Sequence, residues 1–291
     1  MLTLTTLRRL WPSGNSKVPG LLEGIAAAAP IVFPKYGLTT VVSVAQAMAQ
    51  FSHECGAGLE MTENINYSAE RACQVWPNRF SSPADCYAKC DSFSGDPQFH
   101  IKLIDHVYGG RMGNAPYPSH DGSTYIGRGL SQVTGKEGYQ KLATMTGIDV
   151  IAHPEYLSDP KYVLLLGVAD FILCGCLPYA VNGDTLNVTK HLNGGTIGLA
   201  EREAWYAKWK PALEQEKPEA PPVIVQPPAP PVQPVPVPPP APSIHPKHAL
   251  GGAAIIAAII TALQSPKVEI GLAIIAVAIV FAVVLHFIWK R

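Results

Sequence analysis

The chain has 291 residues and carries 22 basic and 22 acidic side chains, so its formal net charge is zero. This length allows one large domain or two small ones, and the absence of a basic block argues against a nucleic-acid substrate. At the N-terminus the charges of Arg8 and Arg9 follow the first apolar residues, and no continuous apolar core is present. We therefore do not expect a Sec signal peptide at this end.

Apolar residues recur at helical spacing through most of residues 1–216, and clear β patterning is almost absent. After a short amphipathic turn or helix near the N-terminus, helices are predicted over 21–33, 39–54, 68–76, 83–90, 99–108, 135–147, 160–176, 186–192 and 198–209. A loop rich in Gly, Pro and Asn at 109–122 is long enough that a functional role is expected. The predicted fold class is mainly α.

The composition changes abruptly after residue 217. Residues 218–242 contain 13 prolines, which predicts an extended polyproline II spacer, with a Pro-rich docking ligand as the alternative. The apolar run 270–289 would form a helix about 30 Å long and matches a bilayer core. The shorter apolar run 249–263 fits half of a hairpin, an interfacial helix or a second span. A buried core helix is disfavoured for this region because the linker isolates it from the domain.

These changes predict three parts. They are a mainly helical domain in 1–216, a Pro-rich linker in 217–246 and one or two membrane segments in 247–291. The lipid bilayer is therefore an expected partner through the C-terminal segment. The sequence makes no prediction of oligomeric state.

The chain has six cysteines, at Cys55, Cys73, Cys86, Cys90, Cys174 and Cys176. Cys86 and Cys90 lie four residues apart, and Cys174 and Cys176 flank a glycine. Neither spacing is a standard zinc pattern, and no matching His pair accompanies either pair. We expect no metal site. Free thiols in a protein made in a reducing cytosol are predicted, with one or two disulfides after export as the alternative.

A pair of carboxylates is the main chemical signal. Glu54 ends the predicted helix of residues 39–54, because Gly56 and Gly58 break it. The negative pole of the helix and nearby apolar surface would favour the protonated carboxyl, the form that a general acid needs. Glu63 follows on a polar segment and would be better solvated. Two carboxylates in contrasting environments are the minimal equipment of a glycoside hydrolase, although composition alone makes this a weak signal.

Specific strings strengthen the interpretation. His-Glu-Cys-Gly at 53–56 precedes Glu-Asn-Ile-Asn-Tyr-Ser-Ala at 63–69, and Tyr-Gly-Gly-Arg-Met-Gly-Asn follows at 108–114. Asp-Gly-Ser-Thr-Tyr-Ile-Gly-Arg-Gly-Leu-Ser-Gln-Val-Thr-Gly comes next at 121–135, and Val-Thr-Lys-His-Leu-Asn-Gly-Gly occupies 188–195. In this order the motifs resemble the family 19 glycoside hydrolases, the chitinase-like group that includes many phage endolysins.

The resemblance implies a lysozyme-like helical domain that hydrolyses a β-1,4 bond next to an N-acetylated sugar, without a cofactor. By motif position, Glu54 would be the general acid, Glu63 the general base, and Thr134 would help to hold the attacking water. Family members invert, which requires carboxyls about 6.5–9.5 Å apart. The residues implied to bind substrate are Tyr125, Gln132, Asn193 and Arg128. Arg111 and Arg128 fit either substrate binding or bracing of the cleft through buried carboxylates.

Two alternatives concern neighbouring residues. Glu60 could replace Glu63 as the base, although its surroundings match the motif less well. His53 precedes the acid, but the helix lacks the second His that a metalloprotease needs, so a structural role is favoured. The chain departs from the family pattern at Cys55, where Ser or Thr is common, and at 57–58, where Ala-Gly replaces Gly-Phe. These departures bear on how Glu54 is positioned.

The membrane segment favours a cell-envelope setting, and no chitin-binding module is visible. The prediction is a peptidoglycan muramidase of a bacteriophage, anchored in the host inner membrane or a virion membrane with its catalytic domain facing the wall. It would act on glycan strands either in lysis or at genome entry. A chitinase is the alternative substrate class. A structural membrane protein with an inactive lysozyme-like domain is the alternative from another functional class, and the presence of both Glu54 and Glu63 argues against it.

Overall fold

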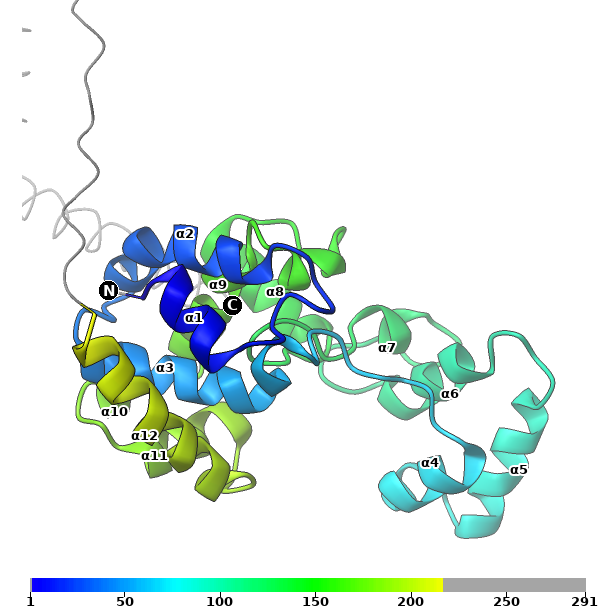
Figure 1. Ribbon diagram of the computed structural model, residues 1–291. Helices are drawn as coiled ribbons and strands as arrows, with labels where there is room; N and C mark the ends of the chain where they lie inside the picture. The colour runs from blue at the N-terminus through cyan, green and yellow to red at the C-terminus, as the bar shows by residue number, and fades with distance from the viewer. Residues whose placement is uncertain (1, 217–291) are drawn as a thin grey trace, which may run out of the picture. The chain divides into compact units, whose positions relative to one another are not determined.

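The computed structural model describes residues 2–216 (Figure 1). The predicted Pro-rich linker and the predicted membrane segments in 247–291 lie outside the described residues. Among residues 2–216, none of the helices has both the length and the apolar character that a bilayer crossing requires.

The described part of the chain is built from helices, which confirms the predicted mainly α class. The α-helices are α1 (Leu4–Leu10), α2 (Leu21–Lys35), α3 (Val41–Glu54), α4 (Ala69–Val75), α5 (Pro83–Phe93), α6 (Phe99–Tyr108), α7 (Asp121–Thr124), α8 (Lys136–Thr146), α9 (Val163–Leu173), α10 (Leu177–Ala180), α11 (Thr185–Asn193) and α12 (Leu199–Glu214). Short 3-10 turns occupy Gly56–Gly58, Pro77–Arg79 and Pro154–Ser158. Within residues 2–216, β pairing is limited to isolated bridges that join Thr62 to Arg128 and Arg128 to Val133.

Two helices are longer than the sequence predicts. Helix α2 continues through Pro30 and Pro34 to Lys35, and α12 continues through Pro211 to Glu214. The φ of a proline is compatible with a helix, but its missing N–H removes one backbone hydrogen bond. A helix can therefore continue through a proline where packing holds the following turn. The buried Phe33 and Leu213 lie beside these prolines and hold the turns against the core.

The central helices pack around α3 and α9. Helix α12 lies along α3, and α2 packs against α9. One face of α9 contributes Val168 and Phe171 to the largest apolar cluster, and the other contributes Leu166 and Ala169 to a second cluster. Because both faces are covered, α9 has a nearly continuous apolar sequence in place of an amphipathic one.

A buried polar contact fixes the last turns of α3. The indole N–H groups of Trp11 and Trp209 both donate to Ser52 Oγ, at 2.8 and 2.7 Å. The Ser52 hydroxyl donates to the Met48 carbonyl at 2.6 Å, so all of its polar capacity is used. The two indole rings also meet edge to face with centroids 6.1 Å apart. The N-terminal segment and α12 are thereby fastened to the end of α3 that carries Glu54.

Helices α4, α5 and α6 share a third apolar cluster, which includes Phe80, Leu103 and Val107. A disulfide joins Cys73 of α4 to Cys86 of α5. The prediction of free thiols is therefore wrong for these two cysteines, because the fold brings together helices whose pairing the cysteine spacing does not indicate. The remaining cysteines, at Cys55, Cys90, Cys174 and Cys176, are free thiols.

Candidate active site

Glu54 is the last residue of α3, as the glycines that follow it predict. Its Oε1 accepts a 2.5 Å hydrogen bond from Nη2 of Arg202, a residue of α12. The Arg202 side chain is only 2% exposed, whereas that of Glu54 is 19% exposed. Arg202 therefore fixes one carboxyl oxygen from inside the protein, and Oε2 has no protein partner in residues 2–216.

Arg202 belongs to a buried polar network on one face of α3. Its Nη1 donates to Gln50 Oε1 at 2.5 Å, and Gln50 Nε2 donates to Thr189 Oγ1 of α11 at 3.1 Å. One turn earlier, Gln46 Nε2 donates to Thr185 Oγ1 at 2.8 Å. Residues 46, 50 and 54 thus form a stripe at the four-residue spacing of one helix face. This stripe sets the rotation of α3 against α11 and α12, and with it the direction of Glu54.

Glu63 lies outside any helix and is held by two donors. The Tyr108 hydroxyl donates to Oε1 at 2.7 Å, and the Gly127 amide donates to Oε2 at 3.0 Å. The Glu63 amide in turn donates to the Gly127 carbonyl at 2.8 Å, so its backbone position is fixed as well. Each carboxyl oxygen keeps a lone pair that a water molecule could use.

Tyr108 ends α6 and packs in the third apolar cluster, which α4, α5 and α6 share. Its ring meets that of Trp76 edge to face at 6.1 Å, and Trp76 packs against Tyr67 at 4.5 Å. Arg79 donates to the Val107 carbonyl at 2.7 Å and so holds the end of α6. Burial and the charge of Glu63 raise the pKa of Tyr108 far above its ordinary value. The phenol consequently remains a hydrogen-bond donor to Glu63 at any physiological pH.

Gly127 is the point at which three predicted site residues meet. A Cβ placed there would lie 3.1 Å from Gln132 Oε1, 3.2 Å from Thr134 Oγ1 and 3.5 Å from Glu63 Cβ. Only a glycine leaves room for this approach without displacing one of them. The structure therefore brings Gln132 and Thr134 next to Glu63, although Thr134 Oγ1 donates to the Gln132 carbonyl at 3.0 Å.

Gln132 also connects the surroundings of Glu63 to the segment that follows Glu54. Its backbone φ is +53°, an uncommon value for a residue with a Cβ and one that concentrates at functional sites. Its Nε2 donates to the carbonyl of Glu60 at 2.8 Å. The Glu60 amide donates to the Cys55 carbonyl at 2.9 Å, next to Glu54. A chain of hydrogen bonds thus runs from the end of α3 to the surroundings of Glu63.

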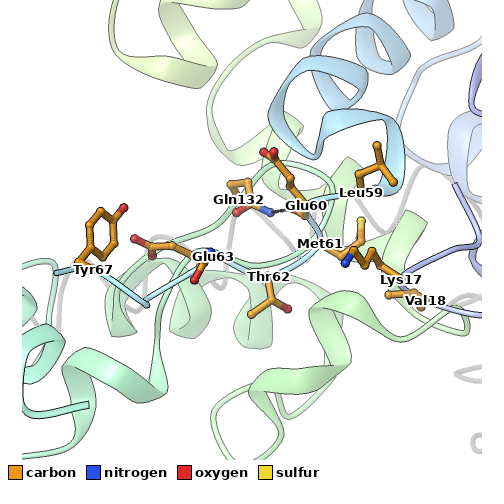
Figure 2. Close-up of a pocket in the computed structure, with 10 residues that line it drawn as sticks. Lys17, Val18, Leu59, Glu60, Met61, Thr62, Glu63, Tyr67 and Gln132 are labelled. Carbon is orange, nitrogen blue, oxygen red and sulfur yellow. Dashed lines mark hydrogen bonds between the residues drawn. The ribbon is translucent and has the colours of Figure 1, made fainter. Parts of the chain in front are cut away.

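A cavity of about 660 Å³ opens beside Glu63. Gln132, Tyr67 and Thr62 line it near the carboxylate, and Leu59, Met61 and Lys17 line it further away (Figure 2). A cavity of this size, with one ordered carboxylate and several polar donors, can hold a sugar chain and a water molecule.

Two predicted substrate-binding residues, Tyr125 and Arg128, have side chains that are bonded within the protein. Tyr125 is only 5% exposed, packs in the second apolar cluster and donates from its hydroxyl to the Ile151 carbonyl at 3.3 Å. This placement does not fit the predicted sugar contact, because the ring faces the core. The Arg128 guanidinium donates to the Thr124 carbonyl at 2.6 Å and to the Tyr139 hydroxyl at 3.0 Å. These bonds are those of a bracing residue, although its partners are neutral oxygens and not the carboxylates expected.

Asn193, the last residue of α11, is exposed and donates to the Ile197 carbonyl at 3.1 Å. The loop after it reaches Gly198, which lies against the ring of His53. Asn193 is thus on the side of the site that carries Glu54, and its sugar contact stays a prediction.

Three titratable groups near Glu54 have shifted pKa values. Burial raises the pKa of Cys55 to about 12, so this thiol is a neutral packing residue. Burial and the charge of Arg202 lower the pKa of His53, which favours the neutral ring. Burial, with a further contribution from Glu54, raises the pKa of Asp170 to about 6. Asp170, a residue of α9, is a further carboxyl with a shifted pKa that the sequence analysis did not identify.

Two more residues escaped the sequence analysis. Tyr108 opens one of the quoted motifs, but nothing local shows that its hydroxyl reaches Glu63. Arg202 lies 148 residues from its partner Glu54. The signal that could have predicted such a partner is the stripe of Gln46, Gln50 and Glu54 in an otherwise apolar helix, because buried polar groups need hydrogen-bond partners.

Known proteins resemble this chain in structure and in sequence. No protein-family model matches the chain. Chitinase C from Streptomyces griseus HUT6037 aligns in structure with a TM-score of 0.46 and 17% identity over 73% of this chain and 92% of its own. A mutant of chitinase C aligns with a TM-score of 0.47 and 14% identity over the same shares of the two chains.

The family assignment rests on a sequence relative. A Haemophilus influenzae protein described as a "Glycosyl hydrolase family 19 domain-containing protein" is 30% identical over 189 residues, which are 65% of this chain and 88% of that protein. The aligned share of the relative is large enough for the family to be assigned from this match. The chain belongs to glycosyl hydrolase family 19 and is a glycoside hydrolase.

Proposed function

We propose that the chain is a muramidase that cleaves the β-1,4 glycan strands of peptidoglycan with inversion. The proposal depends on one observation: the carboxyl groups of Glu54 and Glu63 are each held in place by hydrogen bonds, but from different elements of the fold. Glu54 is held from one side by Arg202, and Glu63 is held by Tyr108 and Gly127 at the edge of a cavity. Two carboxyls in these roles are what an inverting glycosidase requires.

In the proposed reaction Glu54 protonates the leaving glycosidic oxygen through Oε2, the oxygen that Arg202 does not use. Glu63 accepts a proton from a water molecule, which attacks the anomeric carbon from the opposite face. Thr134 and Gln132 lie beside Glu63 and would help to orient that water. The proton gained by Glu63 and the one lost by Glu54 balance, and solvent resets both groups after product release.

The test is a digestion of purified sacculi by the full-length chain in detergent. Glu54→Gln and Glu63→Gln should each lower lysis by about two to four orders of magnitude, the usual contribution of general acid–base catalysis. Glu60→Gln tests the alternative base and should lower it far less. Glu203→Gln is the matched control, because this exposed carboxylate on α12 takes no part in the hydrogen bonds described above. Full activity of either active-site variant would disprove the assignment.

The products decide the bond and the substrate class. A muramidase releases new reducing ends on N-acetylmuramic acid, which mass spectrometry of borohydride-reduced products identifies. New reducing ends on N-acetylglucosamine would contradict the proposal. Rapid cleavage of chitin oligomers without wall lysis would favour the chitinase alternative.

The proposal includes a setting at a membrane. The apolar sequence of 270–289 supports an anchor, and the Pro-rich 217–246 would hold the hydrolase within reach of the wall. The enzyme would be a bacteriophage protein that opens the wall at lysis or at genome entry. Full-length chain should stay with membranes after a carbonate wash, whereas a chain ending at Pro242 should be released. Release of both would remove the anchor from the proposal.

A further inference from the structure

The far end of the cavity beside Glu63 is formed by the N-terminal segment. Lys17 and Val18 line the cavity together with Leu59 and Met61, and Figure 2 shows them at the opposite end of the lining residues from Glu63 and Tyr67. Residue 17 belongs to none of the motifs quoted above. A cation therefore lies in the same cavity as the proposed base, on an element that the sequence analysis left without a role.

The segment that carries Lys17 is firmly held. Asn15 donates from Nδ2 to Glu23 at 2.7 Å and accepts from the Leu22 amide at 2.9 Å. A Cβ on Gly58 would lie 2.9 Å from Gly14 Cα, so the backbones meet in close contact there. With Trp11 anchored to Ser52, the loop is fixed on both sides of Lys17, and its ammonium group is presented from an ordered backbone.

The charge of Lys17 is not neutralised inside the protein. The side chain is exposed, and among residues 2–216 no carboxylate forms an ion pair with it. Glu60 also lines the cavity, but its side chain lies over Gly56, where a Cβ would be 3.4 Å from Glu60 Cδ. The cation is thus free to meet an anion that enters with the substrate.

We propose that Lys17 is a specificity-determining residue that binds a carboxylate on the muramic acid substituent. This inference rests on the proposed function. Chitin is uncharged, whereas muramic acid carries a lactyl group that bears a carboxylate itself or a stem peptide that contains carboxylates. Val18, Leu59 and Met61 provide apolar surface for the methyl groups of the lactyl and alanyl units. The same end of the cavity thereby offers both parts of the chemistry that separates peptidoglycan from chitin.

The experiment measures kcat/KM of the full-length chain on three substrates: peptidoglycan, amidase-treated glycan strands that keep only the lactyl carboxylate, and a neutral chitooligosaccharide. In Lys17→Met the ratio of peptidoglycan to chitooligosaccharide activity should fall roughly twofold to fivefold, as expected for one exposed charge pair. The fall should reside in KM and diminish at high salt. Lys17→Arg should restore the ratio, and Lys17→Glu should lower it further. Lys35→Met, an exposed lysine of α2 outside the cavity, is the matched control.

The possible outcomes distinguish the proposed role of Lys17 from the proposed function of the chain. A fall on amidase-treated strands assigns the contact to the lactyl carboxylate, and a fall on intact peptidoglycan alone assigns it to the stem peptide; either supports the inference. If the wild type cleaves peptidoglycan and Lys17→Met leaves the ratio unchanged, the inference fails while the proposed function stands. If the wild type cleaves only the chitooligosaccharide, the proposed function fails and Lys17 loses its ligand.

Discussion

Removing the Tyr108 hydroxyl tests whether Glu63 is the base. In Tyr108→Phe the ring keeps its packing against Trp76, and the 2.7 Å hydrogen bond to Glu63 Oε1 is lost. A hydrogen bond to a charged group contributes about 1.5–3 kcal/mol. Glu63 is only half-buried and keeps the Gly127 donor, so water can replace part of the loss and the lower figure applies. Because the same bond also stabilises the ionised resting form of Glu63, the fall in kcat comes from the lost orientation of the carboxylate, and about 1.5 kcal/mol sets its upper size at roughly tenfold.

The assay is steady-state hydrolysis of peptidoglycan fragments by the wild type, Tyr108→Phe and the control Tyr36→Phe. Tyr36 is a half-buried tyrosine that packs against the two larger apolar clusters, away from Glu63. We expect kcat to fall in Tyr108→Phe with little change in KM, because the hydroxyl acts on the base and not on the sugar. Circular dichroism must show the same fold. An unchanged kcat in Tyr108→Phe, or an equal fall in Tyr36→Phe, would refute the role of this hydrogen bond.

Two further predictions concern the surroundings of Glu54. Arg202→Met should lower the free energy of unfolding by about 3 kcal/mol, since Gln50 and Glu54 both lose a buried partner; urea titration measures this, and a loss as small as that of the exposed Lys35→Met would contradict it. Asp170 has a folded pKa of about 6 against an ordinary 3.8, so its contribution to stability is complete below pH 3.8 and is lost as the pH rises through about 6. That difference corresponds to at most about 3 kcal/mol. Asp170→Asn should abolish this part of the pH dependence in thermal melts, and an unchanged slope between pH 4 and 6 would show the assignment to be wrong.

Local features of the sequence predicted most of the helices because apolar spacing and breakers act within a few residues. The end of α3 at Glu54 follows from Gly56 and Gly58, which both adopt positive φ. The prediction fails where packing decides. Helix α2 continues through Pro34 because the core holds its last turn, and no local pattern contains that information.

The site was also predicted only in part, because short motifs identify residues but not the packing that places them. Motif resemblance pointed to Glu63, Gln132 and Thr134, which the structure brings together around Gly127. It also pointed to Tyr125, which is buried in the core, because a motif does not distinguish a residue that binds substrate from one that supports the loop. Arg202 is beyond such reasoning, since its role arises only when α12 packs along α3.

The proposed acid and the proposed base are held by different elements, and one short segment joins them. Glu54 is oriented by α11 and α12, whereas Glu63 is oriented by α6 and the Gly127 loop. Residues 55–62 connect the two, and the Met61 carbonyl is fixed by the Gly129 amide at 2.9 Å and the Ser158 hydroxyl at 2.7 Å. The separation of the two carboxyls is therefore set by this connection.

The same segment has an unusual backbone that also positions the N-terminal loop. Ala57 has φ +54°, a left-handed conformation that costs a residue with a Cβ about 1 kcal/mol and that a glycine would adopt freely. At Gly58 a Cβ would lie 2.9 Å from Gly14 Cα, so a glycine is needed for the close approach of the N-terminal segment that carries Lys17. The connection next to Glu54 thus has local strain at Ala57 and leaves room at Gly58 for the segment that we propose binds the carboxylate of the substrate.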